Sequence, residues 1–148
     1  MTGFVSKWVV RQEHTVRADD VDGDGDVRDV VLARWVDEAC AAYLEQCHVL
    51  AEAARQDGLV VRSRVGALPP GAQLGRPSVV AVSAGAREVR ASSFTIGVRV
   101  RTGGENDVAV NASCVVSLED AGTGEVGELG TDVRDELIAL EHAAAHFN

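Results

Sequence analysis

The stretch from Val30 to Gly58, VVLARWVDEACAAYLEQCHVLAEAARQDG, limits the possible folds of this chain more than any other. Its apolar side chains recur at intervals of three and four residues, which predicts one long amphipathic helix that ends at Gly58. The residues on the apolar face are Val31, Trp35, Ala39, Ala42, Tyr43, Cys47 and Leu50. Because that face is wide, we expect the helix to be well buried.

The segments around this helix alternate with the period of a β-strand. One precedes it, over residues 4–18, and four follow it, over 59–68, 78–91, 93–102 and 108–120. Residues 69–77 read as a loop, 103–107 as a hairpin turn and 131–147 as a terminal helix with Thr131 or Asp132 as its cap. The order predicts an α+β fold in one domain, 1–148, with a mostly antiparallel sheet of about five strands against one long helix.

Composition and charge exclude several classes of protein. The chain has 148 residues, 46% of them hydrophobic, and a net charge of -9. Nucleic acid is a poor partner for so acidic a chain, and no apolar run approaches the roughly 20 residues of a membrane span. The three cysteines and the absence of a signal-peptide pattern predict reduced thiols and a cytoplasmic location.

The positive charge gathers in the middle of the chain. Between Leu59 and Arg101 there are seven arginines and one acid, Glu88. A basic surface on an acidic body suits a phosphorylated ligand or an acidic carrier protein, although arginines also occupy the wet face of ordinary sheets.

The segment DDVDGDGDVRD, residues 19–29, packs six aspartates into eleven positions just ahead of the helix. Numbered from Asp20, it supplies most ligands of a calcium loop, but the twelfth position, where a bidentate acid belongs, is Val31. We therefore expect no metal site here. A solvated acidic loop is the plainer alternative. The glycines at 23 and 25 and the apolar Val27 indicate instead a defined turn.

A defined turn at this place suits hydrolysis. Asp29 stands where its carboxylate can cap the helix, whose first N–H groups form an anion or oxyanion site. A carboxylate just upstream can attack or activate water while those N–H groups stabilise the developing oxyanion.

With Asp22, Gly25, Val27, the pair Arg34-Trp35, the run Asp37-Glu38-Ala39 and Tyr43, the sequence resembles hotdog-fold acyl-CoA thioesterases, in particular the 4-hydroxybenzoyl-CoA thioesterase branch. The segments SSFTIGVRV (92–100) and VAVNASCVVSLEDAGTG (108–124) are similar to later strands of that family, so the resemblance runs from about residue 5 to 141.

The resemblance implies a function and a site. Asp22 would be the nucleophile or general base on the thioester carbonyl, and the backbone N–H of Asp29 would hold the thioester oxygen. The substrate would be an acyl-CoA or an acyl-carrier-protein thioester, with its phosphates near the arginine-rich strands and no cofactor. We expect a homodimer or a tetramer of dimers with active sites at the subunit interface.

The chain departs from the family in the turn. Many relatives carry His-Val-Asn-Asn where this sequence has Asp26-Val27-Arg28-Asp29, and often Tyr where Leu32 stands. The additional acids either tune Asp22 or disable it. Two alternatives thus stay open: a non-catalytic acyl-CoA-binding protein, and a hotdog enoyl-CoA hydratase, which needs a histidine that this turn lacks.

Other reactive side chains suggest structural roles. The four histidines show no metal-ligand spacing beyond His142 and His146, four residues apart on the terminal helix. Cys40 and Cys47 lie on one helix face and read as core residues. Ser92 and Ser93 are candidates to orient a water near the site.

Overall fold

The computed structural model describes residues 8–68, 74–75, 77–103 and 107–147. Residues 4–7 of the first predicted strand lie outside this range. So do most of the loop predicted over 69–77 and the tip of the hairpin predicted at 103–107.

Five strands form one antiparallel sheet, as the alternation predicted. Their order in the sheet is β1-β3-β4-β5-β2, and every pair of neighbours is antiparallel. The strands are β1 (Val10–Thr15), β2 (Val60–Val65), β3 (Val79–Val89), β4 (Ser93–Arg101) and β5 (Ala109–Glu119). The first strand is shorter than predicted, since it begins at Val10 and stops at Thr15.

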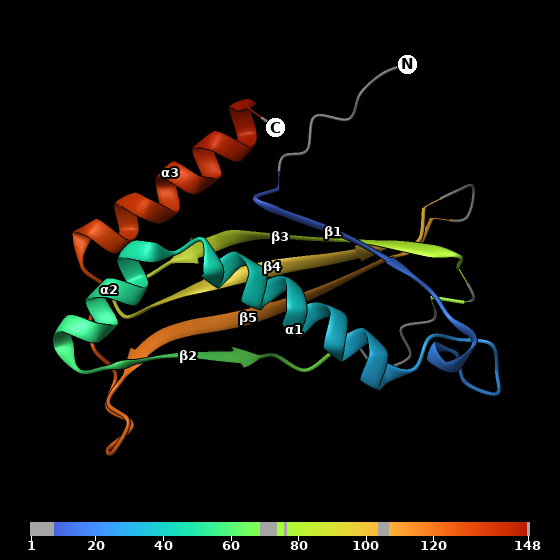
Figure 1. The fold of residues 1–148 in the computed structure, drawn as a ribbon, viewed down its shortest axis with the longest axis horizontal. Coiled ribbons are helices and arrows are strands. Elements are labelled where there is room, and N and C mark those ends of the chain that lie inside the picture. The colour runs from blue at the N-terminus through green and yellow to red at the C-terminus, as the bar shows by residue number, and fades with distance from the viewer. Residues whose placement is uncertain (1–7, 69–73, 76, 104–106, 148) are drawn as a thin grey trace.

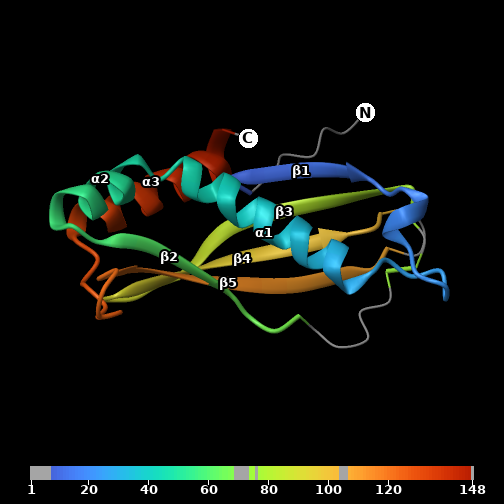
Figure 2. The ribbon, with the colours of Figure 1, turned by 60° about the horizontal axis from the view of Figure 1, so that its bottom comes forward.

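The helix α1 (Asp29–Glu45) lies along one face of this sheet (Figures 1 and 2). Its residues Trp35, Val36 and Tyr43 are at most 2% exposed. They meet the side of β4 that carries Phe94, Ile96, Val98 and Val100, which the alternation over 93–102 sets on one face and which are all buried. The alternation of β4 thus defines two surfaces, one covered by α1 and one on the outer face of the sheet.

The predicted single helix is wrong in one respect, because it breaks at Gln46 and Cys47. The N–H groups of these two residues bond to carbonyls three positions back, and Cys47 leaves the helical conformation with ψ of 69°. A second helix, α2 (His48–Asp57), follows and ends as predicted at Gly58, where φ is 66°.

The break is stabilised from a distant part of the chain. The Glu136 carboxylate accepts hydrogen bonds from the N–H groups of Val49 and Leu50, at 2.9 and 3.3 Å. First-turn N–H groups lack partners within their own helix, so an acid placed there stabilises the new start. Because Glu136 is 87 residues from Val49 in sequence, no pattern near the break could predict it.

Glu136 belongs to α3 (Thr131–Phe147), a full helix that packs beside α2 at one end of the sheet (Figure 1). There β3 runs on past the last residue that pairs with β1, so its outer N–H groups need other partners. Glu141 of α3 accepts from the Ala86 N–H at 3.0 Å and from the Tyr43 hydroxyl at 2.7 Å. Among the described residues, no helix is long and apolar enough to cross a membrane.

Candidate active site

The acidic segment folds into a tight turn between β1 and α1. The Asp22 N–H donates to the Asp26 carbonyl at 2.8 Å, and the Gly25 N–H donates to the Asp22 carbonyl at 3.1 Å. Gly25 has φ of 86°, a conformation that side chains resist. Val21 and Val27, both buried, form a bridge at the base of the turn. The segment is therefore an ordered turn with an apolar anchor, as its glycines and Val27 predicted.

The Asp22 carboxylate lies at the centre of this turn and is exposed to solvent. Its Oδ1 accepts hydrogen bonds from the N–H groups of Asp24 and Asp26, at 2.9 and 3.1 Å. Within the described part of the chain, Oδ2 has no hydrogen-bond partner. One oxygen of the carboxylate is thus held by the backbone, and the other is left without a partner in the described ranges.

Two further acids of the segment have structural partners that the sequence did not indicate. Asp26 Oδ1 accepts from the Gly75 N–H at 3.2 Å, which ties the turn to a segment that precedes β3. Asp20 accepts from the Arg17 N–H at 2.9 Å and lies 3.7 Å from the Arg34 guanidinium. These contacts fix the turn against its neighbours, so the six acids are not equivalent.

The start of α1 differs from the prediction. Asp29 is the first residue of the helix rather than its cap; the cap is Arg28, with no side-chain capping bond. Arg28 is held because its own N–H donates to the Asp20 carbonyl at 2.8 Å, while its carbonyl accepts from Val31 and Leu32. As a first-turn residue, Asp29 has a backbone N–H with no carbonyl partner inside the helix. The expectation that the Asp29 carboxylate caps the helix is therefore wrong, whereas the role of its backbone N–H stays a prediction.

A histidine that the sequence did not connect to this region lies close by. The His14 ring stacks on Trp35, with centroids 5.5 Å apart and an interplanar angle of 21°. Its Nε2 lies 3.8 Å from the Glu38 carboxylate, beyond hydrogen-bond distance. Only the pairing of β1 with the sheet brings His14 under α1, so no motif could have identified it.

Side chains that could bind a metal do not gather in the described ranges: no group of three or more His, Cys, Asp or Glu residues has a suitable arrangement. The rings of His142 and His146 are 4.3 Å apart on α3. The cysteines are core residues, as predicted; Cys40, Cys47 and Cys114 are all buried and free. Burial raises the pKa of the Cys47 thiol to about 12, which makes it a poor nucleophile.

Ser92 and Ser93 lie at the end of β4 opposite to the acidic turn. The Ser93 carbonyl accepts from the Arg90 N–H, and Arg90 contacts α3 through Arg134, whereas the turn adjoins the other end of the sheet at Ser78. Within one subunit these serines therefore cannot orient a water beside Asp22.

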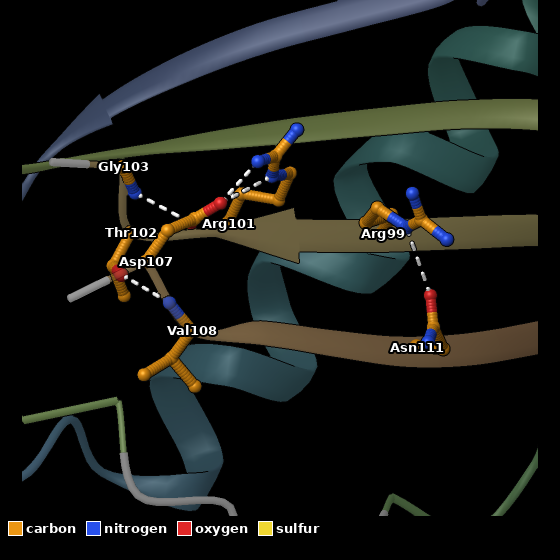
Figure 3. Close-up of polar contacts among 7 residues, drawn as sticks. All are labelled: Arg99, Arg101, Thr102, Gly103, Asp107, Val108 and Asn111. Atoms are coloured by element: carbon orange, nitrogen blue, oxygen red, sulfur yellow. Dashed lines mark hydrogen bonds and ion pairs between the residues drawn. The ribbon is translucent and has the colours of Figure 1, made fainter. Parts of the chain in front are cut away.

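The arginines of the middle strands differ in how they are compensated (Figure 3). Arg101 pairs with Asp107, and Arg64 forms two bonds with Glu119, a carboxylate that is only 4% exposed. Arg99 donates to the Asn111 amide oxygen, at 3.1 Å, and pairs with no carboxylate among the described residues. The predicted basic region is thus real, but part of its charge is neutralised internally.

Comparison with solved structures identifies the fold. A mutant 4-hydroxybenzoyl-CoA thioesterase in complex with 4-hydroxybenzoyl-CoA matches with a TM-score of 0.67 and 16% identity, over 86% of this chain and 97% of the other. A Thermus thermophilus thioesterase in complex with coenzyme A and Zn matches with a TM-score of 0.65 and 25% identity, over 92% and 96%. A 12:0-ACP thioesterase from Umbellularia californica matches with a TM-score of 0.74 and 12% identity, over 95% of this chain and 55% of the other.

No model of a known protein family matches the sequence, and no curated protein is similar to it. The strand order, the helix on one face of the sheet and these structural matches agree with one another. The chain has the hotdog fold, and its structural relatives include 4-hydroxybenzoyl-CoA thioesterase and other thioesterases.

Proposed function

We propose that the protein is a thioesterase that hydrolyses an acyl-CoA or acyl-carrier-protein thioester. The observation that carries the proposal is the arrangement of the turn ahead of α1. Two backbone N–H groups hold one oxygen of the exposed Asp22, and its other oxygen has no hydrogen-bond partner among the described residues. The turn that carries Asp22 leads into α1, whose first N–H groups have no carbonyl partner within the helix. Its structural relatives act on thioesters of coenzyme A and of acyl carrier protein, which supports this substrate class.

The two N–H donors to Asp22 have a chemical consequence. Hydrogen bonds to Oδ1 orient the carboxylate without occupying Oδ2, and a group that is already oriented loses less entropy on reaching the transition state. The Asp29 N–H, at the positive end of the α1 dipole, is of the type that stabilises a developing oxyanion.

Two routes fit these groups. As a general base, Asp22 takes a proton from water while the water oxygen bonds to the thioester carbon; the tetrahedral intermediate then expels the thiolate, which receives that proton. As a nucleophile, Asp22 forms a mixed anhydride and expels the thiolate, and water then hydrolyses the anhydride to the acid. Both routes give a free thiol and a carboxylic acid.

We also propose that the active unit is a homodimer or a tetramer of dimers in the cytoplasm. The strand β2 is an edge of the sheet and pairs only with β5 within the described residues. Four of its six residues are exposed, including Val65 at 38%. An open edge of this kind is suited to pairing with a second copy of the chain.

The test is the release of free thiol from a panel of aliphatic and aromatic acyl-CoAs and acyl-carrier-protein thioesters. The informative variant is Asp22→Asn, because the amide oxygen still accepts the two backbone N–H bonds while the carboxylate is lost. We expect activity to fall by roughly two to four orders of magnitude with the unfolding temperature little changed. Asp24→Asn, in the same turn, is the matched control and should retain activity.

Full activity of Asp22→Asn would refute the assigned role. Two observations also favour a second function, that of a non-catalytic acyl-CoA-binding protein. The Asp22 carboxylate already accepts two backbone hydrogen bonds within the turn, and the same segment carries five more aspartates. Binding of acyl-CoA without thiol release across the panel would establish that function instead. Hydration of an enoyl-CoA by the purified protein would indicate a hydratase.

A further inference from the structure

Two buried polar atoms on β1 lack partners. Gln12 Oε1 and His14 Nε2 are both shielded from solvent, and neither has a hydrogen-bond partner among the described residues. The two residues are two positions apart in the strand, so their side chains lie on the same face, the one that meets α1. Buried polar atoms in proteins are nearly always satisfied, so two such atoms on one face indicate a partner that comes from outside the chain.

Glu38 of α1 brings a carboxylate to these atoms. Its Oε2 lies 3.8 Å from His14 Nε2, beyond hydrogen-bond distance. The His14 ring is held in place because it stacks on Trp35, with centroids 5.5 Å apart. Since β1 and α1 run in opposite directions (Figure 2), Gln12 lies toward the part of α1 that follows Trp35, where Glu38 stands. An imidazole, a carboxylate and an amide oxygen therefore gather at the junction of β1 and α1.

The chemistry of these groups favours a cation over a water molecule. The Gln12 amide oxygen and the Glu38 carboxylate accept hydrogen bonds, and His14 Nε2 also accepts when the ring proton is on Nδ1. A water molecule has two hydrogens and cannot satisfy three acceptors, whereas a metal ion binds a lone pair of each.

The separation of the two charged-type groups supports the same choice. Two groups bridged by a water lie about 4.6 Å apart, since each hydrogen bond is about 2.8 Å long. Two ligands of one tetrahedral zinc ion lie about 3.4 Å apart, since each bond is about 2.1 Å long. The observed 3.8 Å between His14 Nε2 and Glu38 Oε2 is nearer to the second value.

The surroundings suit an ion that enters from solvent. The side chains of His14 and Glu38 are 21% and 48% exposed, so a path leads to the buried Nε2. Arg34 approaches the other oxygen of Glu38, Oε1, at 4.0 Å, and its guanidinium also lies 3.7 Å from Asp20. The guanidinium thus orients the Glu38 carboxylate and leaves Oε2 for the ion, as supporting residues of metal sites do.

We propose that His14, Glu38 and Gln12 bind a divalent transition-metal ion, of which zinc matches them best. Zinc accepts imidazole nitrogen and carboxylate oxygen, and three protein ligands leave a fourth position for water. The set holds only two of the side chains most common at zinc sites, with an amide as the third, so binding is reversible. The bound ion joins the edge strand β1 to α1, and this role is separate from the proposed thioesterase activity.

Zinc chloride is titrated into the full chain by calorimetry, a measurement that needs no turnover. We expect one ion per chain and a rise in Tm on binding. Loss of a residue that only supports a ligand already weakens metal binding by about 10–100-fold, so His14→Gln and Glu38→Gln, which remove ligands, should weaken it at least as much. His142→Gln is the matched control, because the exposed ring of His142 lies 4.3 Å from that of His146, a second pair that could bind zinc.

Trp35 gives a readout that is specific to this place. Cobalt(II) bound to His14 lies against the ring that stacks on Trp35, so it should quench the fluorescence of Trp35. The measurement is made in Trp8→Phe, which leaves Trp35 as the only tryptophan of the chain. The quenching should saturate, and it should disappear when His14→Gln is added.

Three outcomes would overturn the proposal. The first is no binding of zinc at millimolar concentration, as expected of a site that holds only water. The second is loss of binding in His142→Gln with full binding in His14→Gln, which would place the ion on α3. The third is quenching of Trp35 by cobalt(II) that does not depend on His14.

Discussion

The contact between Tyr43 and Glu141 predicts a measurable coupling between α1 and α3. Tyr43 is fully buried, and its hydroxyl donates to Glu141 Oε2 at 2.7 Å. Burial, reinforced by this bond, raises the pKa of Tyr43, so the hydroxyl stays protonated and remains a donor. The same carboxylate accepts from the Ala86 N–H on the free part of the β3 edge. One side chain of α3 therefore satisfies two groups that would otherwise lack partners.

The structure sets the expected magnitudes. Tyr43→Phe removes one hydrogen bond to a charged group, which lowers the free energy of unfolding by about 1.5–3 kcal/mol. Glu141→Ala leaves both the buried Tyr43 hydroxyl and the Ala86 N–H unsatisfied, so its cost is larger, about 2–5 kcal/mol. In the double variant the hydroxyl is already gone, so the two effects should not add; we expect a coupling free energy of about 1–2 kcal/mol.

The assay is urea unfolding followed by circular dichroism, with the wild type, both single variants and the double variant in one cycle. For a chain of this size each 1 kcal/mol corresponds to a shift of about 2–4 °C in Tm. Asp135→Ala, an exposed acid on the same helix, is the control and should change stability by less than about 0.5 kcal/mol. Additive effects within about 0.3 kcal/mol would refute the reasoning, because they would mean that the bond contributes nothing to the docking of α3.

Three further predictions concern stability and reactivity. The Arg64 guanidinium, with Ser117, lowers the pKa of Glu119 from 4.5 to about 2, so the stabilisation by this pair is complete above about pH 4.5 and is lost as the pH falls toward 2. Glu119→Gln should flatten the stability of the protein across that pH window in acid titrations of unfolding, and an unchanged slope would contradict the assignment. Asp22→Ala, which removes the acceptor of two backbone bonds, should lower the free energy of unfolding by about 1–2 kcal/mol more than Asp22→Asn does; equal losses in urea unfolding would show that the turn does not need the acceptor. The native protein should react slowly with a thiol reagent at pH 8 and should yield all its thiols once unfolded, and rapid native labelling would contradict their burial. These thiols are Cys40, Cys47 and Cys114.

How far the site was predictable depends on the range of the interactions involved. The turn around Asp22 was predictable, since Gly25 and Val27 act within a few residues of it. The roles of Asp20 and Asp26 were not, because their partners Arg34 and Gly75 come from other elements. Asp29 was expected as a cap, whereas the backbone bond from Arg28 to Asp20 sets the helix start one residue earlier.

The sequence by itself determined the elements whose signals are local. Period-two alternation placed Phe94 and Ile96 on the buried side of β4, and Gly58 ended the helical region because its left-handed conformation suits a glycine. The periodicity of a segment shows which of its sides is apolar, and this can be seen without knowing which other segments pack against that side.

Only the tertiary structure decided the features that depend on pairs of distant residues. The helix breaks at Cys47 because Glu136, from α3, supplies partners for the new helix start. On the outer face of the sheet the register sets Gly85 opposite Gly97, and Trp8 and Arg87 approach the sheet where these two positions lack a side chain. A hydrogen bond or a strand register joins two parts of the chain at once, so neither part reveals it alone.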